Sequence, residues 1–144
     1  MCIRDRLAVI CIGETKSQRI NGNALSVCGD QIAGSVPDGM TLSANAVAYE
    51  PLWAIGTGHP PTSEQIAEVH AHIRRCLVVR LGAAGREVRI LYGGSVKPSN
   101  ACEILAVPEV GGALIGGASL KATDFEGIVN AVSQRAEPSL AALA

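Results

Sequence analysis

The sequence predicts an α/β fold in which helices cover a parallel sheet. Four short apolar runs show no regular polar alternation, as is typical of strands buried on both faces, and they lie at residues 7–12, 46–49, 88–92 and 113–115. Helical patterns separate the runs, so strand and helix alternate along the chain. With right-handed crossovers, this order fits either an open doubly wound sheet or a piece of a (β/α) barrel.

The helices are predicted from capping residues and apolar spacing. Thr62 and Gln65 fit a capping box, and apolar residues at helical spacing follow as far as a glycine that can end the helix. A second capping box is predicted at residues 123–126, and Pro98 suits the first turn of another helix. Residues 15–36 should be mostly helical, with a break at their Asn-Gly-Asn sequence.

The composition is that of a globular chain and argues against several classes of function. The 144 residues are 48% hydrophobic and 17% charged, with a net charge of −1. This length fits one domain that can bury a core. Scattered Lys and Arg and an aromatic content of 3% predict no nucleic-acid partner. No apolar run approaches the length of a membrane span, and no signal-type apolar core follows the N-terminus.

The cysteines and histidines suggest no metal centre. His70 and His72 lie two residues apart, point in different directions on a helix and are expected at the surface. The cysteine count is odd and no CxxC pair occurs, so we expect free thiols in a reducing cytoplasm. The five cysteines are Cys2, Cys11, Cys28, Cys76 and Cys102.

The candidate catalytic residue is Glu50, in the segment AYEPLWAIGTG at residues 48–58. In parallel α/β folds the functional loops follow the carboxyl ends of strands, where Glu50 is expected. A lone Glu there is usually exposed or caps the next segment. The apolar neighbours of Glu50 would instead remove its carboxylate partly from water, which suits a proton-abstracting base. Residues 53–58 have the apolar body and glycine-rich tip of a closing lid.

Small residues follow the other predicted strands, at Gly13 and at residues 93–95 and 116–117. Glycine lets backbone amides approach a ligand closely, and several converging amides form an anion site. For any single glycine pair, a tight turn is the ordinary explanation. Two pairs together with Gly56 favour a phosphate site. We expect Glu14 to be a supporting salt-bridge partner rather than a second base.

These segments, in this order, resemble the C-terminal half of the triosephosphate isomerase family. The resemblance covers roughly residues 7–135 and rests on four motifs: CIGET at 11–15, AYEPLWAIGTG at 48–58, ILYGGSVKPSNA at 90–101 and LIGGASLKATDF at 114–125. It implies a (β/α) barrel of the TIM type that is incomplete, with roughly strands 5–8 and their helices. That family is itself a known example of a glutamate base that works with a neutral histidine under a closing loop.

The resemblance also divides the chain. Residues 7–136 form the C-terminal half of the barrel, residues 137–144 are a loose tail, and residues 1–6 match nothing in the family, which an artefact at the start of the reading frame would explain. A complete barrel needs about 250 residues and eight strands, so a missing N-terminal half-barrel is expected as a partner.

The resemblance assigns roles to matching positions. Glu50 is the expected proton acceptor in the interconversion of glyceraldehyde 3-phosphate and dihydroxyacetone phosphate through an enediolate. The phosphate is expected at Gly56, Ser95, Gly116 and Gly117. Glu14 and Cys11 are expected to support the site. The lid is expected at Pro51, Leu52, Trp53, Ala54, Ile55, Thr57 and Gly58.

As a family member, the complete protein would be a cytoplasmic homodimer of glycolysis and gluconeogenesis that needs no metal or cofactor and has neither nucleic-acid nor membrane partners. The family's substrate-binding Asn and Lys, and the histidine that polarises the carbonyl, come from the earlier half. We therefore expect this chain alone to be inactive. Two alternatives remain, namely another sugar-phosphate barrel enzyme and a half-barrel that binds phosphate without catalysis.

Overall fold

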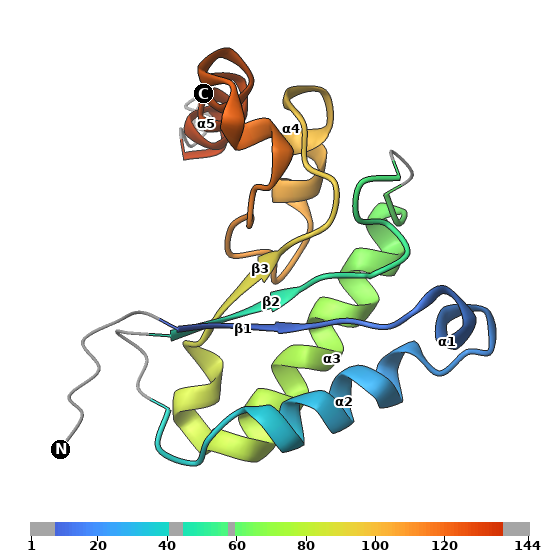
Figure 1. Ribbon diagram of the computed structural model, residues 1–144. Coiled ribbons are helices and arrows are strands. Elements are labelled where there is room, and N and C mark those ends of the chain that lie inside the picture. Colours follow the sequence, from blue (N-terminus) through green and yellow to red (C-terminus); the bar gives the residue numbers. More distant parts are fainter. Residues whose placement is uncertain (1–7, 41–44, 58–59, 137–144) are drawn as a thin grey trace, which may run out of the picture.

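The sheet has three parallel strands. The structure is a computed structural model that describes residues 8–40, 45–57 and 60–136, so both predicted tails and Gly58 lie outside it. Strands β1 (Ala8–Ile12), β2 (Asn45–Tyr49) and β3 (Arg89–Tyr92) pair in the order β1-β2-β3. The register places Ile12 beside Tyr49 and Tyr49 beside Tyr92, so the strands end at the same level (Figure 1).

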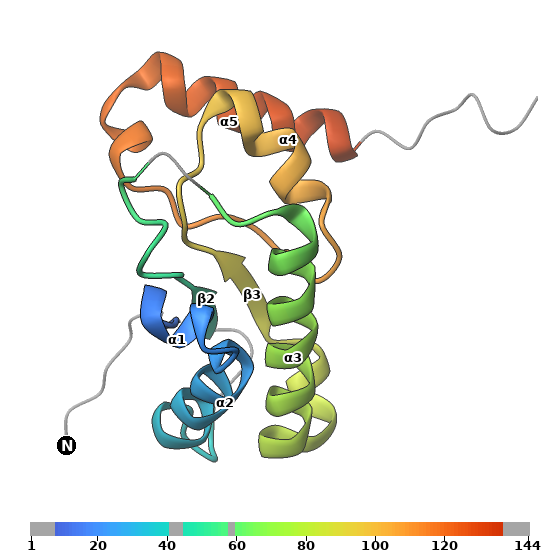
Figure 2. The same ribbon diagram turned by 90° about the vertical axis from the view of Figure 1, so that its right-hand side faces the viewer.

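Helices follow each strand, which confirms the predicted α/β class. α2 and α3 run side by side below the sheet in Figure 1, while α4 and α5 pack together as a second group in Figure 2. In the described part of the chain, the α-helices are α1 (Lys16–Ile20), α2 (Ala24–Ser35), α3 (Ser63–Leu81), α4 (Pro98–Ala106) and α5 (Ala122–Ala136), and the short 3-10 segments are η2 (Gly82–Arg86) and η3 (Gly117–Leu120).

Local capping sets the ends of α3, as predicted. The Thr62 hydroxyl accepts a hydrogen bond from the Gln65 amide, and the Gln65 side chain accepts one from the Thr62 amide at 3.0 Å. Gly82 ends the helix with a φ of 63°, a conformation that favours glycine. The predicted Pro98 start of α4 is also confirmed. The predicted break between α1 and α2 occurs at Asn21–Asn23.

The second predicted capping box is wrong. α5 already begins at Ala122, so Thr123 lies inside its first turn and is not the cap. The Phe125 amide donates to the Lys121 carbonyl at 3.0 Å, so helical bonding starts at Lys121, before the Thr123 cap that the sequence suggested. Conversely, Thr15 and Gln18 form a capping box at α1 that the sequence analysis did not single out.

Two strand predictions also need correction. Residues 113–115 form no strand; Ala113 makes only an isolated bridge with Tyr92, directly after Gly111 and Gly112, which weaken strand formation. β1 is not buried on both faces, because its Ala8, Val9 and Cys11 are exposed. It is an edge strand, and nothing else in the described part of the chain pairs with its outer side.

His70 is fully buried, contrary to the surface position expected for it. Its ring meets the Tyr49 ring edge-on at 5.8 Å between centroids, and its Nδ1 lies 3.2 Å from the Glu109 carbonyl oxygen. The sequence pattern does place His70 on the core face, since it lies four residues after Ile66 and three before Ile73. Burial lowers the pKa of His70 to about 4, with the Glu109 carbonyl opposing the shift.

This buried histidine should make folding stability depend on pH. An unfolded histidine binds a proton below its ordinary pKa of about 6.5, whereas folded His70 does so only near pH 4. The free energy of unfolding should therefore fall between about pH 6.5 and pH 4, by up to about 3 kcal/mol. The free energy of unfolding, measured by urea titration across this range, should depend less steeply on pH in His70→Phe than in the unsubstituted chain. Equal pH dependence in the two chains would contradict the prediction.

Candidate active site

Backbone hydrogen bonds extend the sheet pairing past the ends of the strands. The Glu50 amide donates to the Ile12 carbonyl at 2.7 Å, and the Gly93 amide donates to the Tyr49 carbonyl at 2.8 Å. The three segments therefore leave the sheet side by side. A Cβ on Gly13 would overlap the Glu50 carbonyl, so only glycine allows this approach. The predicted site residues at these strand ends thus share one edge of the sheet.

The Glu50 side chain lies over Gly93, next to the third strand. A Cβ on Gly93 would come within 2.5 Å of Glu50 Cγ, so the glycine leaves room for the carboxylate. Glu50 is half-buried and lies beside the Cys11 thiol. Partial burial and the neighbouring Glu50 charge raise the pKa of Cys11. The structure therefore brings Cys11 and Glu50 together at the position that sequence predicted for the base.

Glu14 is a fully buried carboxylate whose Oε1 accepts several hydrogen bonds. Arg19 donates from Nε at 2.8 Å and Trp53 from Nε1 at 2.8 Å, while the Tyr49 hydroxyl donates at 3.2 Å. The closest Arg19 nitrogen is 2.7 Å from the same oxygen. Burial, followed by the Glu14 charge, raises the pKa of Tyr49, which therefore stays protonated. Glu14 is thus held in a salt bridge, as predicted, while its partner Arg19 was not predicted.

The predicted lid begins as a turn fixed at Trp53. The Trp53 ring lies below the Arg19 guanidinium, at 5.9 Å, in addition to its hydrogen bond to Glu14. Leu52 and Ile55 are exposed by 53% and 47%, so this segment carries apolar surface that a closing movement could bury. Gly56 has a φ of 69°, a left-handed conformation that suits glycine. The predicted lid residue Gly58 lies outside the described residues.

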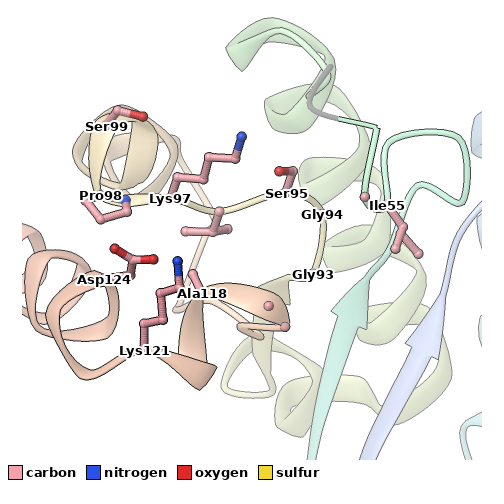
Figure 3. A pocket seen from close by; sticks show the side chains of 14 residues that line it. Ile55, Gly93, Gly94, Ser95, Lys97, Pro98, Ser99, Ala118, Lys121 and Asp124 are labelled. Carbon is pink, nitrogen blue, oxygen red and sulfur yellow. The ribbon is translucent and has the colours of Figure 1, made fainter.

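A cavity of about 680 Å³ opens beside the lid tip (Figure 3). It brings together all of the residues predicted to hold phosphate: Gly56, Ser95, Gly116 and Gly117. No atom lies within 4 Å of where a Cβ on Gly116 or Gly117 would be, so both glycines face open space. The cavity can therefore bring backbone amides close to a small anion.

Charged side chains that sequence analysis did not single out also line the cavity. Lys97 and Lys121 come from the loops before α4 and α5, and Asp124 is in the first turn of α5 (Figure 3). Asn100 holds the loop carrying Ser95, because its side chain donates to the Ser95 carbonyl at 3.0 Å and accepts from the Lys97 amide at 2.8 Å. The available sequence signal for this loop was Pro98 at the start of the helix, followed two residues later by Asn100.

The described residues contain neither a three-ligand metal centre nor a helix that could span a membrane. Within residues 8–40, 45–57 and 60–136, no three His, Cys, Asp or Glu side chains lie close enough together to form a three-ligand metal centre. In the same part of the chain, none of the helices combines the length and apolar character needed to cross a bilayer.

Parallel strands whose carboxyl ends carry a carboxylate and a glycine-lined cavity define part of a ligand-binding (β/α) barrel. A family model described as triosephosphate isomerase matches residues 3–132. The chain belongs to the triosephosphate isomerase family.

Relatives and a solved structure support this assignment. The chain is similar to triosephosphate isomerase of Rhodopseudomonas palustris, with 60% identity over 83% of this chain and 47% of the relative. It is 59% identical to that of Ruegeria sp., over 88% of this chain and 52% of the relative. The crystal structure of triosephosphate isomerase from Bartonella henselae matches with a TM-score of 0.80 at 48% identity, over 88% of this chain and 50% of that one. The chain therefore spans about half the length of these relatives, as an incomplete TIM barrel does.

Removing the positive partner of Glu14 should destabilise the fold. Arg19→Met leaves a buried carboxylate without its ion pair, which typically costs about 3 kcal/mol. Adding Glu14→Gln should recover part of this loss, because the uncompensated charge is gone. Arg75→Met, an exposed arginine without an ion partner among the described residues, should change the free energy of unfolding by under about 0.5 kcal/mol. Equal losses for Arg19→Met and Arg75→Met in urea titrations would show that the pair contributes nothing.

Proposed function

We propose that this chain is the C-terminal half of a triose-phosphate isomerase, an enzyme that interconverts glyceraldehyde 3-phosphate and dihydroxyacetone phosphate. The observation that carries the proposal is the position of Glu50. Its half-buried carboxylate lies over Gly93, and Gly93 also lines the cavity beside the lid. A base and an anion-binding cavity thus share one loop residue, as a small phosphorylated substrate requires.

In the proposed reaction, the Glu50 carboxylate takes a proton from the carbon next to the substrate carbonyl. The electron pair of that C–H bond moves into the carbonyl and gives an enediolate. Glu50 then returns the proton to the former carbonyl carbon, while the hydroxyl proton of the other carbon passes to the former carbonyl oxygen. The hydrogen is weakly acidic, so the base must be aimed at it in a site without water. Closure of the lid over Glu50 would exclude that water and bury Leu52 and Ile55.

The phosphate is proposed to bind in the cavity, away from the reacting carbons. Amides at Gly116, Gly117 and Ser95 would donate to its oxygens, and Lys97 and Lys121 would add positive charge. Binding energy from this remote group would drive lid closure and so favour the transition state. The lid turn is tied to the end of β1, because the Trp53 indole donates a hydrogen bond to Glu14.

The rest of the enzyme is proposed to come from a further half-barrel. The described sheet ends at the exposed edge of β1, where another parallel strand could pair. That half would supply the group that polarises the carbonyl and stabilises the enediolate. A homodimer in the cytoplasm, working in glycolysis and gluconeogenesis without a metal or cofactor, belongs to the same proposal and is supported by the family assignment.

A second candidate function is phosphate binding by a half-barrel without catalysis. The observation that favours it is that the cavity is built within this chain, whereas Glu50 is not among its lining residues. The two functions differ in turnover, which the following tests measure.

Activity should require both the missing half and Glu50. Here the completed protein is this chain joined behind the first half of the Ruegeria sp. relative. The chain alone should show negligible turnover of glyceraldehyde 3-phosphate, and the completed protein should show clear turnover. Glu50→Gln should lower its kcat by about 10³-fold with little change in KM, because a base is lost while phosphate contacts remain. Glu87→Gln, at an exposed residue, is the matched control. Undiminished kcat in Glu50→Gln would refute the proposal.

Phosphate binding can be tested separately from turnover. Phosphoglycolate added to the completed protein should shift the amide NMR signals of Gly56, Ser95, Gly116 and Gly117. Gly117→Ala should weaken binding by about tenfold, because the new methyl group enters open cavity space without touching protein atoms. Gly34→Ala, which also meets open space but lies on α2, should bind normally. Shifts elsewhere but not at these amides would place the anion outside the cavity.

A further inference from the structure

A second hollow of about 570 Å³ lies between α2 and α3 and shares no lining residue with the candidate active site. The two helices run side by side along one face of the sheet (Figure 2). α2 contributes Gly29 and Asp30 to the wall, and α3 contributes His72 and Cys76. None of the steps proposed for the isomerase reaction uses these residues.

His72 and Cys76 form a close pair in this hollow. They lie one turn apart on α3, so both side chains project from the same face of the helix. His72 Nε2 and Cys76 Sγ are 3.4 Å apart, and both residues are half-buried. A thiolate sulfur and an imidazole nitrogen are the ligands that zinc prefers.

We propose that His72 and Cys76 bind a divalent transition-metal ion of the zinc type in the hollow between α2 and α3. Zinc bonds sulfur at about 2.3 Å and imidazole nitrogen at about 2.0 Å, so a tetrahedral ion separates the two ligand atoms by about 3.6 Å. The observed separation of 3.4 Å differs from this by little, and small side-chain rotations would admit the ion. Water fills the remaining coordination positions.

Gly29 leaves space for the ion. A Cβ at this position would lie 3.2 Å from His72 Nε2 and 3.6 Å from Cys76 Sγ, so glycine keeps the side of the pair that faces α2 open. The hollow therefore reaches both ligand atoms. Gly29 lies within α2, where alanine is a better helix former than glycine, so replacing it should not weaken the helix.

The hollow is lined by the Asp30 carboxylate and by the guanidiniums of Arg75 and Arg80. The Asp30 carboxylate lines the hollow and can attract the ion or one of its waters. Arg80 is engaged by Asp38 at 3.1 Å and by the Val36 carbonyl at 3.0 Å. Burial raises the pKa of Cys76 and Arg75 opposes that shift, so metal binding must displace the thiol proton.

The first test is titration of the full 144-residue chain with Zn²⁺ against a chromogenic chelator, and with Cd²⁺ to follow the thiolate charge-transfer band. We expect one ion per chain. Cys76→Ser should remove the charge-transfer band, and either Cys76→Ser or His72→Gln should weaken Zn²⁺ binding by about tenfold or more. Cys102→Ser, at an exposed cysteine on α4, is the matched control and should bind as the unsubstituted chain does.

Two further measurements separate this site from other thiols. Gly29→Ala keeps both ligands but narrows the space beside them, so it should weaken Zn²⁺ binding without lowering the helical circular dichroism signal. Bound Zn²⁺ should also slow alkylation of Cys76 while leaving Cys102 unprotected, as mass spectrometry of peptides would show. Binding that survives Cys76→Ser, or equal protection of both cysteines, would overturn the proposal. No saturable binding at one equivalent would overturn it as well.

Discussion

The site depends on two backbone hydrogen bonds that continue the sheet beyond its strands. The Glu50 amide bonds the Ile12 carbonyl, and the Gly93 amide bonds the Tyr49 carbonyl. They keep three chain segments in register after the strands end, so residues distant in sequence meet at one edge. The constraint is steric as well, because Glu50 passes so close to residues 13 and 93 that only glycine, which has no side chain, fits at either position. The carboxylate is thus positioned by rigid backbone rather than by a flexible loop.

Burial of Glu14 is the second constraint. A charged carboxylate without water is costly unless it is paired and hydrogen-bonded, and here Arg19, Tyr49 and Trp53 supply the partners. The arrangement ties the base of the lid to the end of β1. A movement of Trp53 would give up one hydrogen bond to Glu14 while the ion pair with Arg19 remains. The lid can therefore move without leaving the buried charge unpaired.

The sequence predicted what local spacing and capping determine. The start of α3 at its Thr62 cap and the parallel strands followed from patterns within a few residues. The position of Glu50 at a strand end followed in the same way. Lys121 was missed, because only tertiary packing brings it to the cavity. Arg19 was missed although it lies close to Glu14 in sequence, because no local pattern shows that the two side chains turn toward each other. The exposure of β1 did not follow from its apolar run alone, since such a run cannot show whether its neighbour strand is present.

The central claim is that Glu50 exchanges a proton with the carbon next to the substrate carbonyl. Solvent isotope exchange measures that step directly, whatever limits overall turnover. In heavy water, the completed protein should place deuterium on this carbon of dihydroxyacetone phosphate, as NMR of the recovered substrate would show. With Glu50→Gln, incorporation should fall to the rate in buffer alone. Incorporation at an equal rate by the Gln form would contradict the account.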